Sequence, residues 1–192
     1  MPEQAPHELF SDVSWAMARG LPKRDLVAML NKLATTAADG SDEQMFAKLE
    51  LASLIVQEEP FRAARLALDV THACMSDRAF GILGVAHSLL GSFGAARRAH
   101  ERAVQLAPDC AAHRHNLGHL LDVAFERPRE ALRHLRAAAK LSPSDPAIAS
   151  SLAHALVRAG HRAKARTILV CELAWDAEEA ETTLTSWANA GR

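Results

Sequence analysis

The sequence predicts an all-α fold built as an array of antiparallel helix hairpins. Ala, Leu and Arg dominate the 192 residues, and all three are strong helix formers. Small residues and prolines also recur at intervals of 34 to 35 residues, which indicates that one structural unit repeats along the chain. The apolar fraction of 49% is typical of a globular protein that buries its own core.

The repeat is defined by three kinds of marker. Leu83-Gly84 is followed 34 residues later by Leu117-Gly118, and then 35 residues later by Leu152-Ala153. An alanine marker and a proline marker follow at similar spacing: Ala96, Ala131 and Ala165, then Pro108 and Pro143. Small residues allow the two helices of a hairpin to cross closely, and proline suits a helix boundary rather than a helix interior.

This pattern resembles the tetratricopeptide-repeat family. In that family an aromatic residue, a Leu-Gly pair, further small residues and a closing proline recur about every 34 residues. The present sequence departs from the family at the large positions, where it carries His87, His100, Arg114, Leu121 and Leu135. The resemblance implies a right-handed superhelical array of hairpins that binds other proteins.

The N-terminal part is expected to be helical but does not match the repeat. Apolar spacing predicts helices over Glu8–Ala18 and Arg24–Thr36, separated by Gly20-Leu-Pro22. Residues 1–41 are therefore interpreted as a helical extension, either a cap or an arm for dimerisation or partner binding. A degenerate repeat is predicted over residues 42–76, with Pro60 opening its second helix.

Three clear repeats are predicted next, over residues 77–110, 111–145 and 146–175. Gly91 and Gly160 are placed in the turns between helices, where a positive φ is often needed. The one extra residue of the second repeat is expected in the turn at Phe125-Glu-Arg-Pro128. Residues 176–192 are predicted to form a C-terminal capping helix, with Trp175 and Trp187 packed at the junction.

Composition and missing motifs exclude several functions. A net charge of −1 does not suggest nucleic-acid binding, and no catalytic motif is found, so the chain is predicted to be neither a nucleic-acid binder nor an enzyme. No cofactor is expected. The three cysteines are far apart and indicate no disulfide framework, and neither a signal peptide nor a membrane span is recognised. A cytoplasmic location is the expectation.

The family resemblance implies a ligand groove on the concave side, lined by the first helix of each hairpin. The predicted partner-binding residues are Arg78, Val85, Ser88, Leu89, His115, His119, Asp122, Ser150, His154 and Arg158. Gly81, Ala112, Val123, Ala147 and Val157 stand at equivalent repeat positions, and Phe46, Leu49 and Gln57 in the degenerate repeat. The lining suits a peptide segment, with Arg78 and Arg158 available for carboxylates. It lacks the Lys and Asn set of the carboxylate clamp found in chaperone-binding members, since only Asn116 has a counterpart.

The histidines of this groove leave two further interpretations open. His115 and His119 are four residues apart, a spacing that can bind metal, and His113 and His154 are expected nearby. No Cys or acidic partner accompanies them, so ordinary groove side chains are favoured over a metal site. A pH-sensitive groove is the other interpretation.

The predicted function is an adaptor, scaffold or chaperone that binds a segment of a partner protein. The layout of a helical arm before about three repeats is also similar to that of bacterial type III secretion chaperones for translocator proteins. The alternative is a self-assembling structural protein that forms a homodimer through its N-terminal arm or its capping helices.

Overall fold

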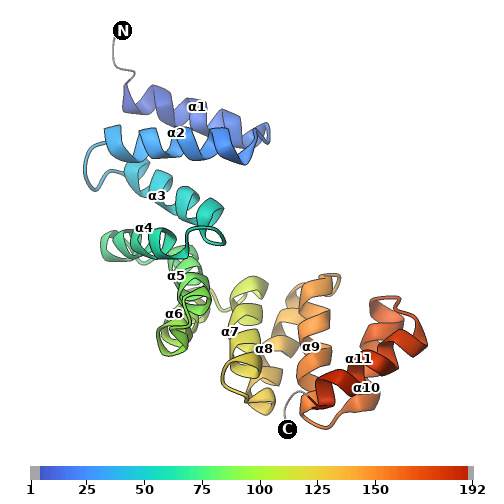
Figure 1. Ribbon diagram of the computed structural model, residues 1–192. Coiled ribbons are helices and arrows are strands. Elements are labelled where there is room, and N and C mark those ends of the chain that lie inside the picture. Colours follow the sequence, from blue (N-terminus) through green and yellow to red (C-terminus); the bar gives the residue numbers. More distant parts are fainter. Residues whose placement is uncertain (1–4, 190–192) are drawn as a thin grey trace. The chain divides into compact units, whose positions relative to one another are not determined.

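The structure is a computed structural model that describes residues 5–189, and every regular element in that range is helical (Figure 1). The first helices in chain order are α1 (Pro6–Ala18), α2 (Lys23–Thr36), α3 (Asp42–Ile55), α4 (Pro60–Ala73), α5 (Asp77–Leu89) and α6 (Phe93–Leu106). They are followed by α7 (Ala111–Val123), α8 (Pro128–Leu141), α9 (Pro146–Arg158), α10 (Arg162–Thr167), the π-helix η1 (Ile168–Glu172) and α11 (Ala177–Asn189). The predicted all-α class is confirmed.

The chain divides into two compact units between Ala99 and His100, within α6. The first four residues of the predicted extension over 1–41, and the last three of the predicted cap over 176–192, lie outside the described residues. All three cysteines are free thiols. Within residues 5–189, no helix has both the length and the apolar character that crossing a membrane requires.

The first unit is a succession of helices in which each packs on the next, from α1 to α5. The two N-terminal helices form where apolar spacing predicts them, beginning one or two residues earlier. The apolar face of α2 is buried at Leu26, Leu30 and Leu33, with Met29 half-buried. Pro60 occupies the first turn of α4, as predicted. Its fixed φ suits that position, and its missing N–H leaves no helical hydrogen bond unmade there.

The second unit is held together by close packing between successive helices. In α7, a Cβ added at Gly118 would lie 2.7 Å from Leu135 Cγ of α8, closer than real carbon contacts allow. The small-residue marker therefore marks a real close approach of the two helices. Leu121 and Leu135 are fully buried in the core that α7, α8 and α9 share.

The turns within hairpins explain the glycine pattern and the extra residue of the second repeat. Gly91 and Gly160 adopt φ values of 70° and 88°, which confirms the predicted left-handed turns. The turn between α7 and α8 has four residues, 124–127, against three at 90–92 and 159–161. The insertion thus falls where the sequence predicts it. Glu126, at φ 54°, takes the left-handed position there without being glycine.

The C-terminal helix caps the last hairpin, as predicted. After η1, Ala174 adopts a φ of 55°, and the chain turns into α11, which packs on α9 and α10 (Figure 1). Asp176 Oδ1 accepts the backbone N–H of Glu178 at 2.8 Å and begins the helix. Trp175 and Trp187 pack against the core of this unit, which confirms their predicted place. The π-helix was not predicted from the sequence.

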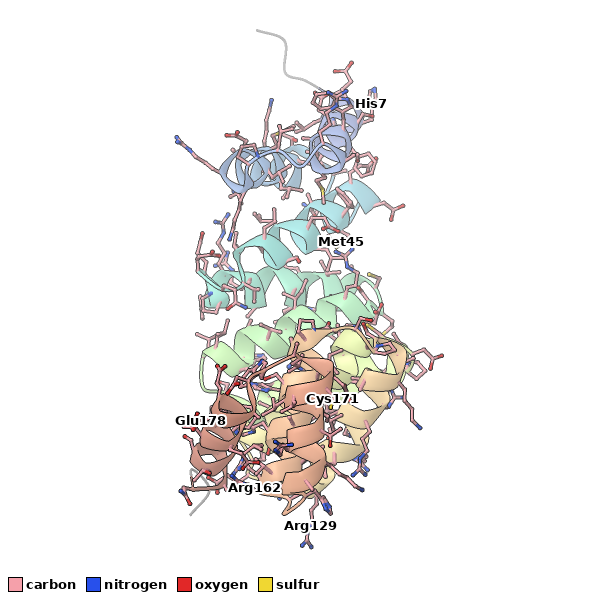
Figure 2. The ribbon with its side chains drawn as sticks, turned by 90° about the vertical axis from the view of Figure 1, so that its right-hand side faces the viewer. His7, Met45, Arg129, Arg162, Cys171 and Glu178 are labelled. Carbon is pink, nitrogen blue, oxygen red and sulfur yellow. The ribbon has the colours of Figure 1, made fainter. Side chains whose placement is uncertain are left out.

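An ion pair ties this cap to the hairpin. Arg162 of α10 donates to the Glu181 carboxylate of α11 at 2.7 Å. Figure 2 labels Arg162 on α10 and Glu178 on α11, on neighbouring helices. The pair is half exposed, so it orients α11 more than it stabilises the unit.

Candidate functional site

Four predicted partner-binding residues of the first unit lie on α5, and the polar side chains among them already make hydrogen bonds within the chain. Arg78 Nη1 donates to Glu50 Oε1 of α3 at 2.8 Å, and this hydrogen bond raises the pKa of the guanidinium. The hydroxyl of Ser88 donates to a backbone carbonyl of its own helix at 2.9 Å. Val85 is half-buried, whereas Leu89 is exposed. Leu89 is therefore the open apolar contact among these four.

In the second unit, α7, α9 and α11 together line a pocket of about 200 Å³. We call it the α7–α9–α11 pocket; its lining residues are His119, Val123, Ser150, Ser151, His154 and Trp187. His119, Ser150 and His154 belong to the predicted groove, and the structure brings them together. Ser151 and Trp187 were not predicted.

A buried carboxylate supports this pocket from behind. Asp122 of α7 is 1% exposed, and its Oδ2 lies 2.5 Å from His154 Nδ1 of α9. Arg158, one turn further along α9, donates from Nη1 to Asp122 Oδ1 at 3.1 Å and also to the Asp122 backbone carbonyl. Charge-assisted hydrogen bonds of this kind are short and strong, and a buried charge needs them. Asp122 thus holds the two α9 side chains in place.

These contacts correct two expectations about the groove. Asp122 does not line the surface, because its side chain points into the interface between α7 and α9. Arg158 is not free to bind a partner's carboxylate, contrary to the expectation from the sequence, whereas the Arg78 side chain is 53% exposed and its availability stays a prediction. Each guanidinium already pairs with a carboxylate of the chain, and the Arg158 side chain is only 12% exposed.

The histidines of α7 are joined to α9 through one serine. Ser151 Oγ lies 2.9 Å from His115 Nε2 and 3.5 Å from His119 Nδ1. Partial desolvation lowers the pKa of His115 and the pKa of His119, which favours neutral rings at neutral pH. His113 is buried instead of joining them. Among residues 5–189, no cluster of three or more His, Cys, Asp or Glu side chains is arranged to hold a metal ion.

The capping helix supplies one wall of the pocket. The indole of Trp187 meets the His154 ring edge to face, with ring centroids 5.1 Å apart and planes at 74°. Sequence reasoning placed Trp187 at the junction but not in the site. The order of the helices could have predicted this role. Because α11 follows the second helix of the last hairpin, it takes the place that the first helix of a further repeat would occupy.

A second hollow of about 370 Å³ adjoins Arg158 at the turn between α7 and α8. Acidic and basic side chains both line it: Glu126, Glu130, Arg127 and Arg129. Arg127 Nη1 lies 3.6 Å from Glu130 Oε1. Arg129 projects away from the ribbon (Figure 2). This mixture does not select a ligand of either charge.

Hairpins that stack with small residues at their crossings define a helical-repeat protein. Residues 122–170 match the family model of the tetratricopeptide repeat, which confirms the family resemblance read from the markers. The chain has the fold of tetratricopeptide-repeat proteins, and such repeats generally serve as protein-binding modules.

Solved structures agree with this assignment at the level of the fold. A crystal structure of MamA protein is 19% identical, with a TM-score of 0.68 over 93% of this chain and 94% of that one. MamA from Desulfovibrio magneticus RS-1 is 15% identical, with a TM-score of 0.68 over 97% of each chain. YrrB, described as a TPR protein with an unusual peptide-binding site, is 16% identical, with a TM-score of 0.64 over 95% and 89%. No curated protein matches significantly.

Proposed function

We propose that the chain is an adaptor that holds a segment of a partner protein on the α7–α9–α11 pocket. The observation that carries this proposal is the support of His154 by the buried Asp122 carboxylate. A side chain that is locked before binding loses less entropy when the partner arrives, so preorganisation favours affinity.

The size of the pocket supports a protein partner over a metabolite. Its volume of about 200 Å³ is below the range of roughly 300–1,000 Å³ that is common for small-molecule sites. One bulky side chain fits, while the rest of the partner lies along the neighbouring helices. The peptide-binding site described for YrrB, whose fold is similar, is in keeping with this proposal.

Blocking the pocket tests the proposal. Ser150 lines the pocket, and Ser150→Trp fills it with an indole. The matched control is Ser53→Trp, an exposed position on α3 in the other unit. With the full chain as bait in an extract of its source cells, we expect a partner that the native chain and Ser53→Trp retain and Ser150→Trp loses. Retention of every partner by Ser150→Trp contradicts the proposal.

A second candidate function is self-association through the N-terminal helices, and one observation favours it. Trp15 of α1 is 57% exposed, with the Arg19 guanidinium 4.6 Å from its ring centroid. A large exposed aromatic side chain is typical of an interface. If α1 forms a dimer, light scattering finds the native chain dimeric and Trp15→Glu monomeric. A native chain that is monomeric at all concentrations excludes this alternative.

A further inference from the structure

We propose that the α7–α9–α11 pocket selects a partner side chain that donates a hydrogen bond, and that its preferred occupant is a tyrosine. This inference rests on the proposed function and names the chemistry that the same site recognises. It follows from which atom His154 presents to the pocket, from the walls around that atom, and from the absence of an unpaired charge in the lining.

The hydrogen-bonding role of His154 is set by Asp122. A carboxylate only accepts hydrogen bonds, so the proton of the neutral imidazole must lie on Nδ1, the atom 2.5 Å from Asp122 Oδ2. The other ring nitrogen, Nε2, then carries a lone pair and can only accept. Among the described residues, the hydrogen bond of the His154 ring is made by Nδ1, and the ring lines the pocket. At this ring nitrogen the pocket therefore offers an acceptor that a ligand donor can satisfy.

Arg158 shares the Asp122 carboxylate with His154. Its guanidinium lies 3.1 Å from Asp122 Oδ1 and compensates the carboxylate charge. Arg158 lines the adjoining hollow rather than this pocket. A ligand carboxylate in the pocket would thus face the Nε2 lone pair with no free cation to receive it. A ligand ammonium would find no uncompensated carboxylate. An uncharged donor is the occupant that pairs with Nε2 and needs no charged partner in the lining.

The walls favour an aromatic donor over a small hydroxyl side chain. Trp187 meets the His154 ring edge to face, and Val123 supplies an exposed aliphatic wall. Serine or threonine would leave much of the volume of about 200 Å³ unfilled. Phenylalanine would fill it but would desolvate Nε2 without a partner, which costs binding free energy. Tyrosine satisfies both conditions through its ring and its hydroxyl.

The tautomer is tested first, on the full native chain. Two-bond ¹H–¹⁵N correlation spectra distinguish a protonated Nδ1 from a protonated Nε2 in each histidine. We expect His154 to be the Nδ1–H tautomer at neutral pH. A spectrum that shows a proton on Nε2, in a neutral or a charged ring, overturns the proposal. The measurement needs no variant that could fail to fold.

Selectivity is tested next with two uncharged probes, N-acetyl-tyrosinamide and N-acetyl-phenylalaninamide. Binding is followed through the indole N–H signal of Trp187, assigned with Trp187→Phe. We expect the tyrosine probe to bind about fivefold more tightly, as one added hydrogen bond implies. The preference should vanish in His154→Phe and persist in His161→Phe, a matched change at an exposed turn position outside the pocket. Equal affinity of the two probes for the native chain overturns the proposal.

Failure of this inference is separable from failure of the proposed function. If Ser150→Trp loses a protein partner while the two probes bind equally, the adaptor role stands and tyrosine selection does not. If the tyrosine probe is preferred while Ser150→Trp loses no partner, the selectivity stands and the adaptor role does not.

Discussion

His154 Nδ1 lies 2.5 Å from Asp122 Oδ2, and this contact joins the first helices of two successive hairpins. The pair connects a residue that lines a pocket to one that is sealed from solvent. Because Arg158 binds the same carboxylate, the side chains of Asp122, His154 and Arg158 form one network between α7 and α9. The packing of the second unit and the chemistry of its pocket therefore depend on the same group.

Removal of the Asp122 carboxylate is expected to destabilise the second unit. Asp122→Ala leaves His154 and Arg158 without their shared acceptor, and breaking a buried pair costs about 3–5 kcal/mol. The control is Asp69→Ala, which breaks an ion pair with Lys48 in which the Asp69 side chain is half exposed, for about 1 kcal/mol or less. Urea unfolding measures both. Equal losses would show that the buried network contributes little to stability.

The close crossing of α7 and α8 is expected to reject even one methyl group. Gly118→Ala places a Cβ 2.7 Å from Leu135 Cγ and 3.3 Å from the Ala131 carbonyl oxygen. Overpacking of this kind costs about 1–3 kcal/mol, although alanine has the better helix propensity. Gly94→Ala on α6 is the control, because its Cβ meets only an arginine tip at 3.8 Å. We expect Gly118→Ala to lower the melting temperature and Gly94→Ala not to lower it. A Gly118→Ala variant that is more stable than the native chain would contradict the close crossing.

The turn between α7 and α8 is expected to gain stability from a glycine. Glu126 holds a φ of 54°, whereas Gly91 and Gly160 occupy the equivalent left-handed positions of the neighbouring hairpins. Relief of this strain in Glu126→Gly should raise the free energy of unfolding by about 0.5–1 kcal/mol. Glu58→Gly, in a turn without positive φ, loses an ion pair with Lys23 and should not stabilise. Chemical denaturation compares them, and a destabilised Glu126→Gly argues against strain.

Acidification is expected to weaken the second unit through His100. This side chain is 2% exposed, its Nδ1 has no partner among the described residues, and burial lowers its pKa from 6.5 to about 4. Between these two values the unfolded chain binds more protons than the folded one, so stability is complete above pH 6.5 and falls towards pH 4. The loss is on the order of 3 kcal/mol.

His100→Leu tests whether His100 causes this pH dependence, because leucine has a similar size and no titrating group. Unfolding free energies between pH 7.5 and about 4 should fall less steeply in His100→Leu than in the native chain. Some slope remains, since desolvation also lowers the pKa values of His115, His119 and His134. His161→Leu, an exposed control, should keep the native slope. An unchanged slope in His100→Leu excludes His100 as the source.

The hairpin order was predictable because its signals are local. Gly91 and Gly160 mark left-handed turns, and Pro60 marks a helix start, since each acts on its own backbone. The extra turn residue at 124–127 was predictable from spacing alone. The π-helix over Ile168–Glu172 was not predictable, because no local residue preference marks it. It packs against α9, α10 and α11, which the sequence pattern does not specify.

By itself, the sequence determined the helices, their pairing into hairpins and the helix face on which His119 and His154 lie, because periodic small and apolar residues specify these. Only the tertiary structure decided which polar side chain is open and which is buried. Adjacent helical residues point about 100° apart, so Asp122 is 1% exposed while Val123 is 51% exposed. The contact of Asp122 with His154, and that of His154 with Trp187, depend on how α7, α9 and α11 pack. His154 and Trp187 are 32 and 65 positions from Asp122, so no local sequence pattern predicts these contacts.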